Sequence, residues 1–200
     1  TESLSPMTKP ICFVTGNPNK AREFKHIVGD EFSSSIVHQK FDVPEIQGTP
    51  SEVAIAKASA AAAAYGGPVF TEDVSLCFHS LKGLPGPYIK DFFTKLGHDG
   101  LNNMLAGFED KGVTAMCVFA YCPGPSEPVT LFIGECEGYV VPARGNGNFG
   151  AFGWDPIFEP VSEREGEGRT FAQMSAEDKH AISHRGNAVR KVVPFIRSLL

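Results

Sequence analysis

The sequence has few cysteines, and they are not arranged for metal or disulfide chemistry. There are five in 200 residues, an odd number, and no two form a CxxC pair. The set therefore indicates neither a disulfide framework nor a zinc site. Cys12, Cys77 and Cys117 lie inside apolar runs, where cysteine is a core residue. We expect a reducing, cytoplasmic environment.

Long apolar runs and an excess of basic residues are also missing. No stretch is apolar for long enough to cross a membrane, and the first ten residues, TESLSPMTKP, lack the pattern of a secretory signal. We expect residues 1–9 to form a loose polar tail. Lys and Arg number 18 against 23 Asp and Glu, a net charge of −5. This excludes the general basic surface that coats nucleic acid but allows a local basic cluster for a small anion.

The remaining composition predicts one globular domain over residues 1–200, with 42% hydrophobic and 20% charged residues. Strand-like and helix-like patterns alternate in the first half of the chain. Two long β runs follow and predict a hairpin, and the C-terminus is helical from about Ser175. This order predicts a mixed α/β sheet. The strands are expected at 10–15, 33–40, 68–73, 113–122 and 129–141, and the first two helices at 18–28 and 51–65.

The stretch TGNPNK (15–20) links the first predicted strand to the first helix. Free backbone N–H groups and the positive end of a helix dipole meet there, which suits an anion. A positive charge is unfavourable beside the positive end of a helix dipole, so Lys20 is poorly placed in the first helical turn. A bound anion would account for a lysine at this position. The loop is not a Walker A loop, since GxxxxGK[ST] is absent. An ordinary strand-to-helix turn is the competing interpretation.

Three acidic residues are candidates for a metal site. Glu45 lies in an extended stretch, and Glu72 and Asp73 end the short strand VFTED. Strand ends are where ligand sites collect in α/β sheets, and Mg²⁺ prefers oxygen ligands shared with phosphates. Solvated or capping roles are the alternative for each.

Two later motifs carry polar and aromatic groups together. FGWDP (152–156) holds the only tryptophan, and its rings could stack on a base or fill the core. KHAISHR (179–185) groups donors beside a predicted helix start, with a solvated surface as the alternative. A Ser–His–Asp hydrolase is disfavoured because no GxSxG elbow is present.

Six stretches in order, TGNPNK, PEIQG, EDVSLCF, LPGPYIK, RG…FGWDPIF and SHR, span nearly the whole chain. In this order the sequence resembles the inosine triphosphate pyrophosphatase family, the HAM1-like noncanonical purine NTP pyrophosphatases. The resemblance implies hydrolysis of ITP, dITP and XTP at the α–β phosphoanhydride bond, giving the monophosphate and pyrophosphate. It implies Mg²⁺, with Mn²⁺ as a substitute. It also implies an elongated twisted mixed sheet flanked by helices, in two lobes with a central cleft, and a homodimer that binds neither nucleic acid nor membrane.

The resemblance also implies roles for individual residues. Glu45 and Asp73 would bind the metal, Asp73 would orient or deprotonate the attacking water, and Lys20 would act with them in catalysis. Phe152 would stack on the base, with its neighbours beside it. The substrate-binding set would be Thr15, Gly16, Asn17, Lys20, Lys57, Lys90, Phe152, Gly153, Trp154, Asp155, Lys179, Ser183, His184 and Arg185.

Two departures from the family pattern affect these expectations. Val74 stands where the family usually has Ser or Thr, so no side-chain role is expected there. The loop RGNGNFGAFGWDP is longer than usual and contains two Phe-Gly pairs, so Phe149 competes with Phe152 for the stacking role. A nucleotide-binding protein without turnover, and a pyrophosphatase for modified pyrimidine or standard nucleotides, are the alternative functions.

Overall fold

The computed structural model describes residues 9–16, 36–145, 153–163 and 168–199. The predicted helix over 18–28 and most of the predicted N-terminal tail lie outside these residues. So do four of the sequence-derived candidates, Asn17, Lys20, Phe149 and Phe152.

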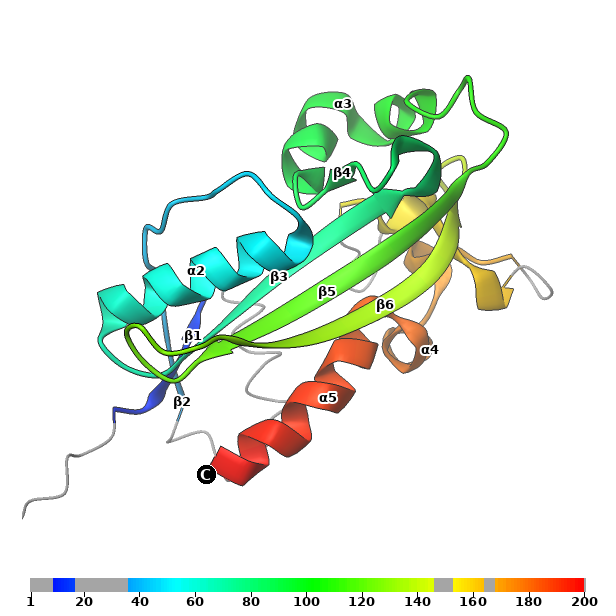
Figure 1. Ribbon diagram of the computed structural model, residues 1–200. Helices are drawn as coiled ribbons and strands as arrows, with labels where there is room; N and C mark the ends of the chain where they lie inside the picture. Colours follow the sequence, from blue (N-terminus) through cyan, green and yellow to red (C-terminus); the bar gives the residue numbers. More distant parts are fainter. Residues whose placement is uncertain (1–8, 17–35, 146–152, 164–167, 200) are drawn as a thin grey trace, which may run out of the picture. The chain divides into compact units, whose positions relative to one another are not determined.

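The strands form one seven-stranded mixed sheet (Figure 1), with the order β2-β1-β3-β5-β6-β7 and β4 paired to β3. β1 runs parallel to β2 and β3, whereas β4 and β7 are antiparallel to their neighbours. The mixed sheet predicted from the sequence is confirmed. The strands are β1 (Ile11–Val14), β2 (Ile36–Gln39), β3 (Val69–Phe78), β4 (Pro85–Gly86), β5 (Gly112–Cys122), β6 (Thr130–Val140) and β7 (Phe158–Pro160).

β5 and β6 form the predicted hairpin. They are neighbours in the sheet and are joined only by residues 123–129. A parallel crossover needs about a dozen residues or more, so this short connection requires an antiparallel pair.

The helix that follows Thr49 and the helix that follows Ser175 each begin at a residue whose side chain caps the helix. Thr49 and Glu52 form a capping box at the start of α2, in which the Thr49 N–H and hydroxyl each donate to the Glu52 carboxylate at 2.8 Å and lower its pKa. The helix predicted from Ser175 is two helices, and Ser175 caps the first of them. The described helices are α2 (Pro50–Tyr65), α3 (Ile89–Asn103), α4 (Ala176–Ile182) and α5 (His184–Leu199).

The chain divides into two compact units. Unit 1 comprises Thr1–Glu72, Phe119–Phe132 and Lys191–Leu200, and unit 2 comprises Asp73–Val118 and Ile133–Arg190. The central cleft expected from the resemblance stays a prediction.

Unit 1 is held together by aromatic rings and small residues. Phe195 of α5 packs on Tyr121 and Phe132, with ring centroids 5.1 and 4.8 Å apart, and Phe70 lies 4.8 Å from Tyr121. Such tilted and edge-on aromatic contacts add to the energy of burial. The inner face of α2 is lined by the fully buried alanines Ala54, Ala58, Ala61 and Ala62.

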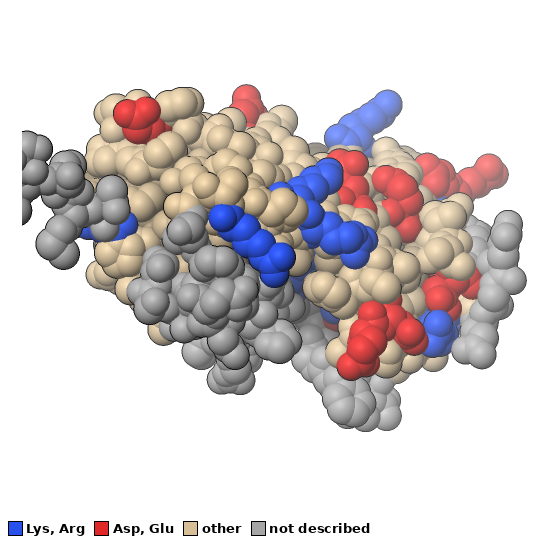
Figure 2. Space-filling view, turned by 90° about the horizontal axis from the view of Figure 1, so that it is seen from below, with Lys and Arg blue, Asp and Glu red and all other residues tan. Residues whose placement is uncertain are grey.

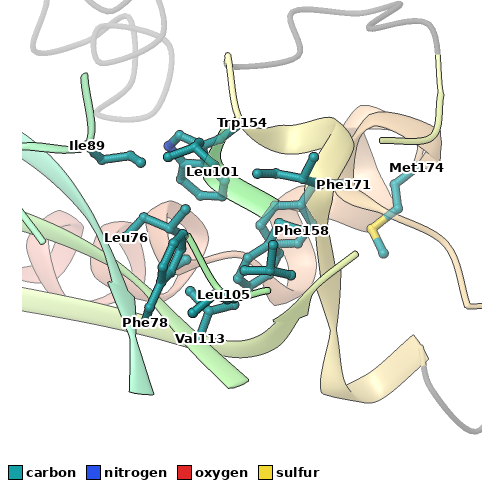
Figure 3. Packing of buried hydrophobic residues seen from close by; sticks show 13 residues of the cluster. Leu76, Phe78, Ile89, Leu101, Leu105, Val113, Trp154, Phe158, Phe171 and Met174 are labelled. Carbon is teal, nitrogen blue, oxygen red and sulfur yellow. The ribbon is translucent and has the colours of Figure 1, made fainter. Parts of the chain in front are cut away.

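Unit 2 has a hydrophobic core of its own (Figure 3). Trp154, Phe158 and Phe171 pack with leucines from β3 and α3, and all three aromatic residues are at least 96% buried. Trp154 to Phe158 is 5.5 Å and Phe158 to Phe171 is 4.6 Å between ring centroids. The segment carrying FGWDP is thus anchored in the core of unit 2.

The start of α5 lies tightly against β6 at Gly134 (Figure 1). A Cβ on Gly134 would lie 2.1 Å from the backbone N of Ala188 and 2.2 Å from the His184 carbonyl oxygen. Both are main-chain atoms, so no rotamer change can relieve the clash.

We predict that Gly134→Ala destabilises the protein by about 3 kcal/mol, because the helix must move away from the strand. Urea denaturation followed by circular dichroism measures the change. Gly107→Ala is the control, since a Cβ at Gly107 meets no atom within 4 Å. Equal stability of the two variants would contradict the close packing.

Candidate functional site

Thr15 and Gly16 follow β1 directly, as both the ligand-loop and the ordinary-turn interpretations predict. The Thr15 N–H donates to the Gln39 carbonyl at 3.1 Å, which holds the first loop residue against β2. Gly16 is exposed, and a Cβ there would come within 3.0 Å of the Lys40 side chain. The loop therefore begins at the carboxyl end of a parallel strand, where α/β proteins bind ligands.

The prediction that Glu72 and Asp73 end a short strand is wrong, because β3 continues to Phe78 and both acids lie inside it. Glu72 is 7% exposed and Asp73 is half-buried. Successive side chains of a strand point to opposite faces of the sheet, so Glu72 and Asp73 cannot both face the same ligand. β1 and β3 are parallel and pair in register at Phe13 and Phe70. Thr15 lies two residues beyond this pair on the chain that continues β1, and Glu72 lies two residues beyond it along β3. The two residues therefore follow the pair at matching positions within unit 1.

The other candidates of the N-terminal half lie on or near helices. Glu45 is exposed in the segment that leads to the Thr49 cap of α2, and Lys57 is half-buried on that helix. Lys90 is exposed in the first turn of α3.

In FGWDP, the described residues Trp154 and Asp155 are buried. Trp154 is 4% exposed and Asp155 is fully buried. The Lys179 ammonium donates to the Asp155 carboxylate at 2.5 Å. This ion pair joins the segment after β6 to α4.

The residues of SHR form the junction between α4 and α5. The Ser183 hydroxyl accepts from the Gly186 N–H at 3.1 Å and so caps α5. The His184 ring is 4% exposed and packs on Trp154 at 5.3 Å and on Phe171 at 6.1 Å. Arg185 is half-buried beside it. The structure thus brings together FGWDP and SHR, which are distant in sequence.

Sequence reasoning did not single out two contributors to this cluster. Phe171 stacks with His184, and the Lys179 ammonium lies 5.4 Å from the centre of the same ring. His98 contacts the carbonyl oxygen of Gly153 at 2.5 Å. Neither Phe171 nor His98 belongs to a sequence motif, and their contacts form only in the tertiary structure. No signal in the sequence could therefore have singled them out.

Cysteine chemistry is disfavoured at the two partly exposed thiols. Burial, reinforced by nearby glutamates, raises the pKa of Cys77 to about 11 and that of Cys136 to about 12. Both thiols are therefore protonated at neutral pH and are poor nucleophiles.

On the face seen in Figure 2, basic and acidic side chains are both present, and some of them lie side by side. Among the described residues, no three His, Cys, Asp or Glu side chains gather closely enough to hold a metal ion. In the same part of the chain, no helix combines the length and apolarity needed to span a bilayer.

Comparison with known proteins identifies the family. The model of the Ham1 family matches residues 11–195. The chain belongs to the Ham1 family. A curated inosine triphosphate pyrophosphatase from Yarrowia lipolytica is 53% identical over 186 residues, covering 93% of this chain and 95% of the relative. One from Giardia intestinalis is 50% identical over 188 residues, covering 94% and 92%.

Solved structures of Ham1 proteins confirm the fold class. The HAM1 protein from Coxiella burnetii matches with a TM-score of 0.81 at 27% identity, covering 94% of this chain and 98% of that one. A dITP/XTP pyrophosphatase from Mycobacterium abscessus matches with a TM-score of 0.73 at 25% identity, covering 92% and 98%.

In this Ham1 protein, we predict that Asp155→Asn lowers the free energy of unfolding by about 3 kcal/mol. The change leaves the Lys179 ammonium, whose side chain is only 21% exposed, without its carboxylate partner. Chemical denaturation at neutral pH measures the loss.

Asp178→Asn is the matched control for this substitution. Asp178 also pairs with a cation, Arg169 at 3.2 Å, but its side chain is 53% exposed, so the expected cost is below about 1 kcal/mol. Similar losses in the two variants would show that burial does not set the value of the ion pair.

Proposed function

We propose that the protein is a nucleoside triphosphate pyrophosphatase that hydrolyses ITP, dITP and XTP to the monophosphate and pyrophosphate. The observation that carries the proposal is the joint cluster of FGWDP and SHR in unit 2, built around the Asp155–Lys179 ion pair. These are the two motifs that the resemblance assigns to the base. The names of the curated relatives support the same reaction.

The phosphates are proposed to bind at the start of the chain. Thr15, Gly16, Asn17 and Lys20 would contact them in the loop after β1, with Lys57 and Lys90 adding positive charge. Phosphoryl transfer to water needs neutralised charge and an aligned nucleophile more than covalent help from the protein. A site of this kind is compatible with a net charge of −5, because only local cations are required.

Glu45 and Asp73 are proposed to hold a divalent ion, Mg²⁺ or in its place Mn²⁺. Carboxylate oxygens suit this ion, which commonly uses only one or two of them and completes its shell with water and phosphate oxygens. The chemical type of these two side chains therefore suits the ion, and no third acid is required. When bound, the ion would neutralise charge on the phosphates. Asp73 would orient or deprotonate the attacking water.

The base is proposed to bind beside the FGWDP–SHR cluster. Phe152, or Phe149 in its place, would stack on the purine next to Gly153. Ser183, His184 and Arg185 would present the α4–α5 junction to it. Since their side chains are buried, Trp154 and Asp155 would act by holding this junction and Lys179 in place.

Selectivity would follow from the group at position 6 of the purine. Hypoxanthine and xanthine carry a carbonyl there, whereas adenine carries an amino group. A donor such as Arg185 or a nearby backbone N–H would pair with that carbonyl. In adenine it would face the amino group, which is also a donor, and the unpaired donor would cost about 1–3 kcal/mol. A homodimer, a cytoplasmic location and the absence of nucleic-acid and membrane partners also stay part of the proposal.

A substrate panel tests the proposed reaction. We expect Mg²⁺-dependent pyrophosphate release from ITP and XTP at least tenfold faster, as kcat/KM, than from GTP, ATP or dUTP. No release from any of them would reject the enzyme in favour of a binding protein. Preference for dUTP, GTP or ATP would favour the alternative pyrophosphatases.

A substitution at Asp73 tests the proposed role of this carboxylate. We expect Asp73→Asn to lower kcat for ITP by about 10²–10⁴-fold, the range for loss of a general base, while ITP still binds in calorimetry. Glu127→Gln, at an exposed carboxylate between β5 and β6, is the control and should keep wild-type kcat. Turnover of Asp73→Asn at the wild-type rate would remove Asp73 from catalysis.

A further inference from the structure

α3 is broken into two arms at Gly97. This residue has φ +63° and ψ −169°, a conformation that is open essentially to glycine alone. A Cβ there would meet no atom within 4 Å, so the backbone conformation, not space, requires glycine. The break sets the direction of the second arm, which begins at His98.

The second arm holds two segments of unit 2 by their backbone. His98 and Asn102 are four residues apart and share one face of the helix. The His98 Nε2 lies 2.5 Å from the Gly153 carbonyl oxygen, and the Asn102 amide donates to the Val141 carbonyl at 3.1 Å. Because a carbonyl oxygen can only accept, the His98 Nε2 carries the proton in this bond.

Gly153 is also held from the first arm of α3. A Cβ on Gly153 would come within 2.5 Å of the Phe93 ring. The Phe93 and His98 rings themselves are 5.1 Å apart. Gly153 thus contacts both arms, and its position is defined by a ring on one side and a hydrogen bond on the other.

The two residues after Gly153 contact the helices on either side of the SHR junction. Trp154 packs on the His184 ring at 5.3 Å, and Asp155 holds the Lys179 ammonium at 2.5 Å. Gly153, which accepts the hydrogen bond from His98, is therefore followed directly by Trp154 and Asp155. These are the two residues whose contacts join FGWDP to α4 and α5.

We propose that His98 is a positioning residue for the base-binding end of the site, and that its hydrogen bond to Gly153 sets the KM for ITP and the preference for ITP over ATP. This inference rests on the proposed function. His98 does not touch the phosphates or the water in this scheme, so the chemical step is left unchanged when the bond is lost.

Two substitutions separate the hydrogen bond from the packing of the ring. His98→Phe keeps an aromatic ring against Phe93 but has no donor, whereas His98→Gln keeps an N–H donor of similar reach. Lys95→Ala, at an exposed position on the first arm of the same helix, is the control.

We expect His98→Phe to raise the KM for ITP about tenfold, to keep kcat within twofold and to lower the ITP-to-ATP ratio of kcat/KM. His98→Gln and the control should keep wild-type values, and all variants should keep similar thermal midpoints. A His98→Phe enzyme with wild-type KM and selectivity would overturn the proposal. So would parallel losses of kcat, stability and KM in both His98 variants, which would indicate a structural role only.

Equilibrium binding of ITP, measured by calorimetry, keeps this test independent of turnover. If the wild-type protein releases no pyrophosphate, the proposed function fails, and the dissociation constants of the same variants decide the role of His98. A tenfold weaker constant for His98→Phe, restored in His98→Gln, supports positioning. Equal constants, or no ITP binding by the wild-type protein, overturn it.

Discussion

The arrangement of unit 2 depends on the ion pair between Asp155 and Lys179. Removing a carboxylate from water is costly, and Asp155 is fully buried. The Lys179 ammonium donates directly to this carboxylate and offsets the cost. The pair fixes α4 relative to the segment before β7, and α4 leads into the SHR junction. The His184 ring then stacks on Trp154, which closes the cluster. Loss of either partner leaves the other with a charge that water reaches poorly.

This constraint explains why residues expected to line the site are buried. Trp154, Asp155, Ser183 and His184 are each less than 5% exposed, and each makes a contact within the cluster. A rigid support of this kind positions a few nearby groups with little freedom, which is what discrimination between purines requires. Under the proposed function, core packing and recognition are not competing interpretations of these motifs, since the same contacts would serve both.

Much of the fold could be predicted from local pattern. The Thr49 cap followed by an alanine-rich run specifies α2, and the apolar runs joined by CPGPSEP specify the β5–β6 hairpin. The order of six short motifs pointed to the Ham1 family. The sequence predicted helical structure from about Ser175 and a helix start beside SHR. It did not show that Ser183 itself divides two helices, because the cap forms only where the Ser183 hydroxyl meets the Gly186 N–H.

The sequence by itself indicated most of the longer strands and helices, the family and the residue types available for phosphate, metal and base. The tertiary structure alone decided which of them meet. Lys179 and Asp155 could each have been solvated, and nothing in the local pattern pairs them. His98 and Phe171 carried no motif signal, yet they contact Gly153 and His184. The physical reason is that secondary structure follows from interactions over a few residues, whereas burial, ion pairing and ring stacking depend on segments that only folding brings together.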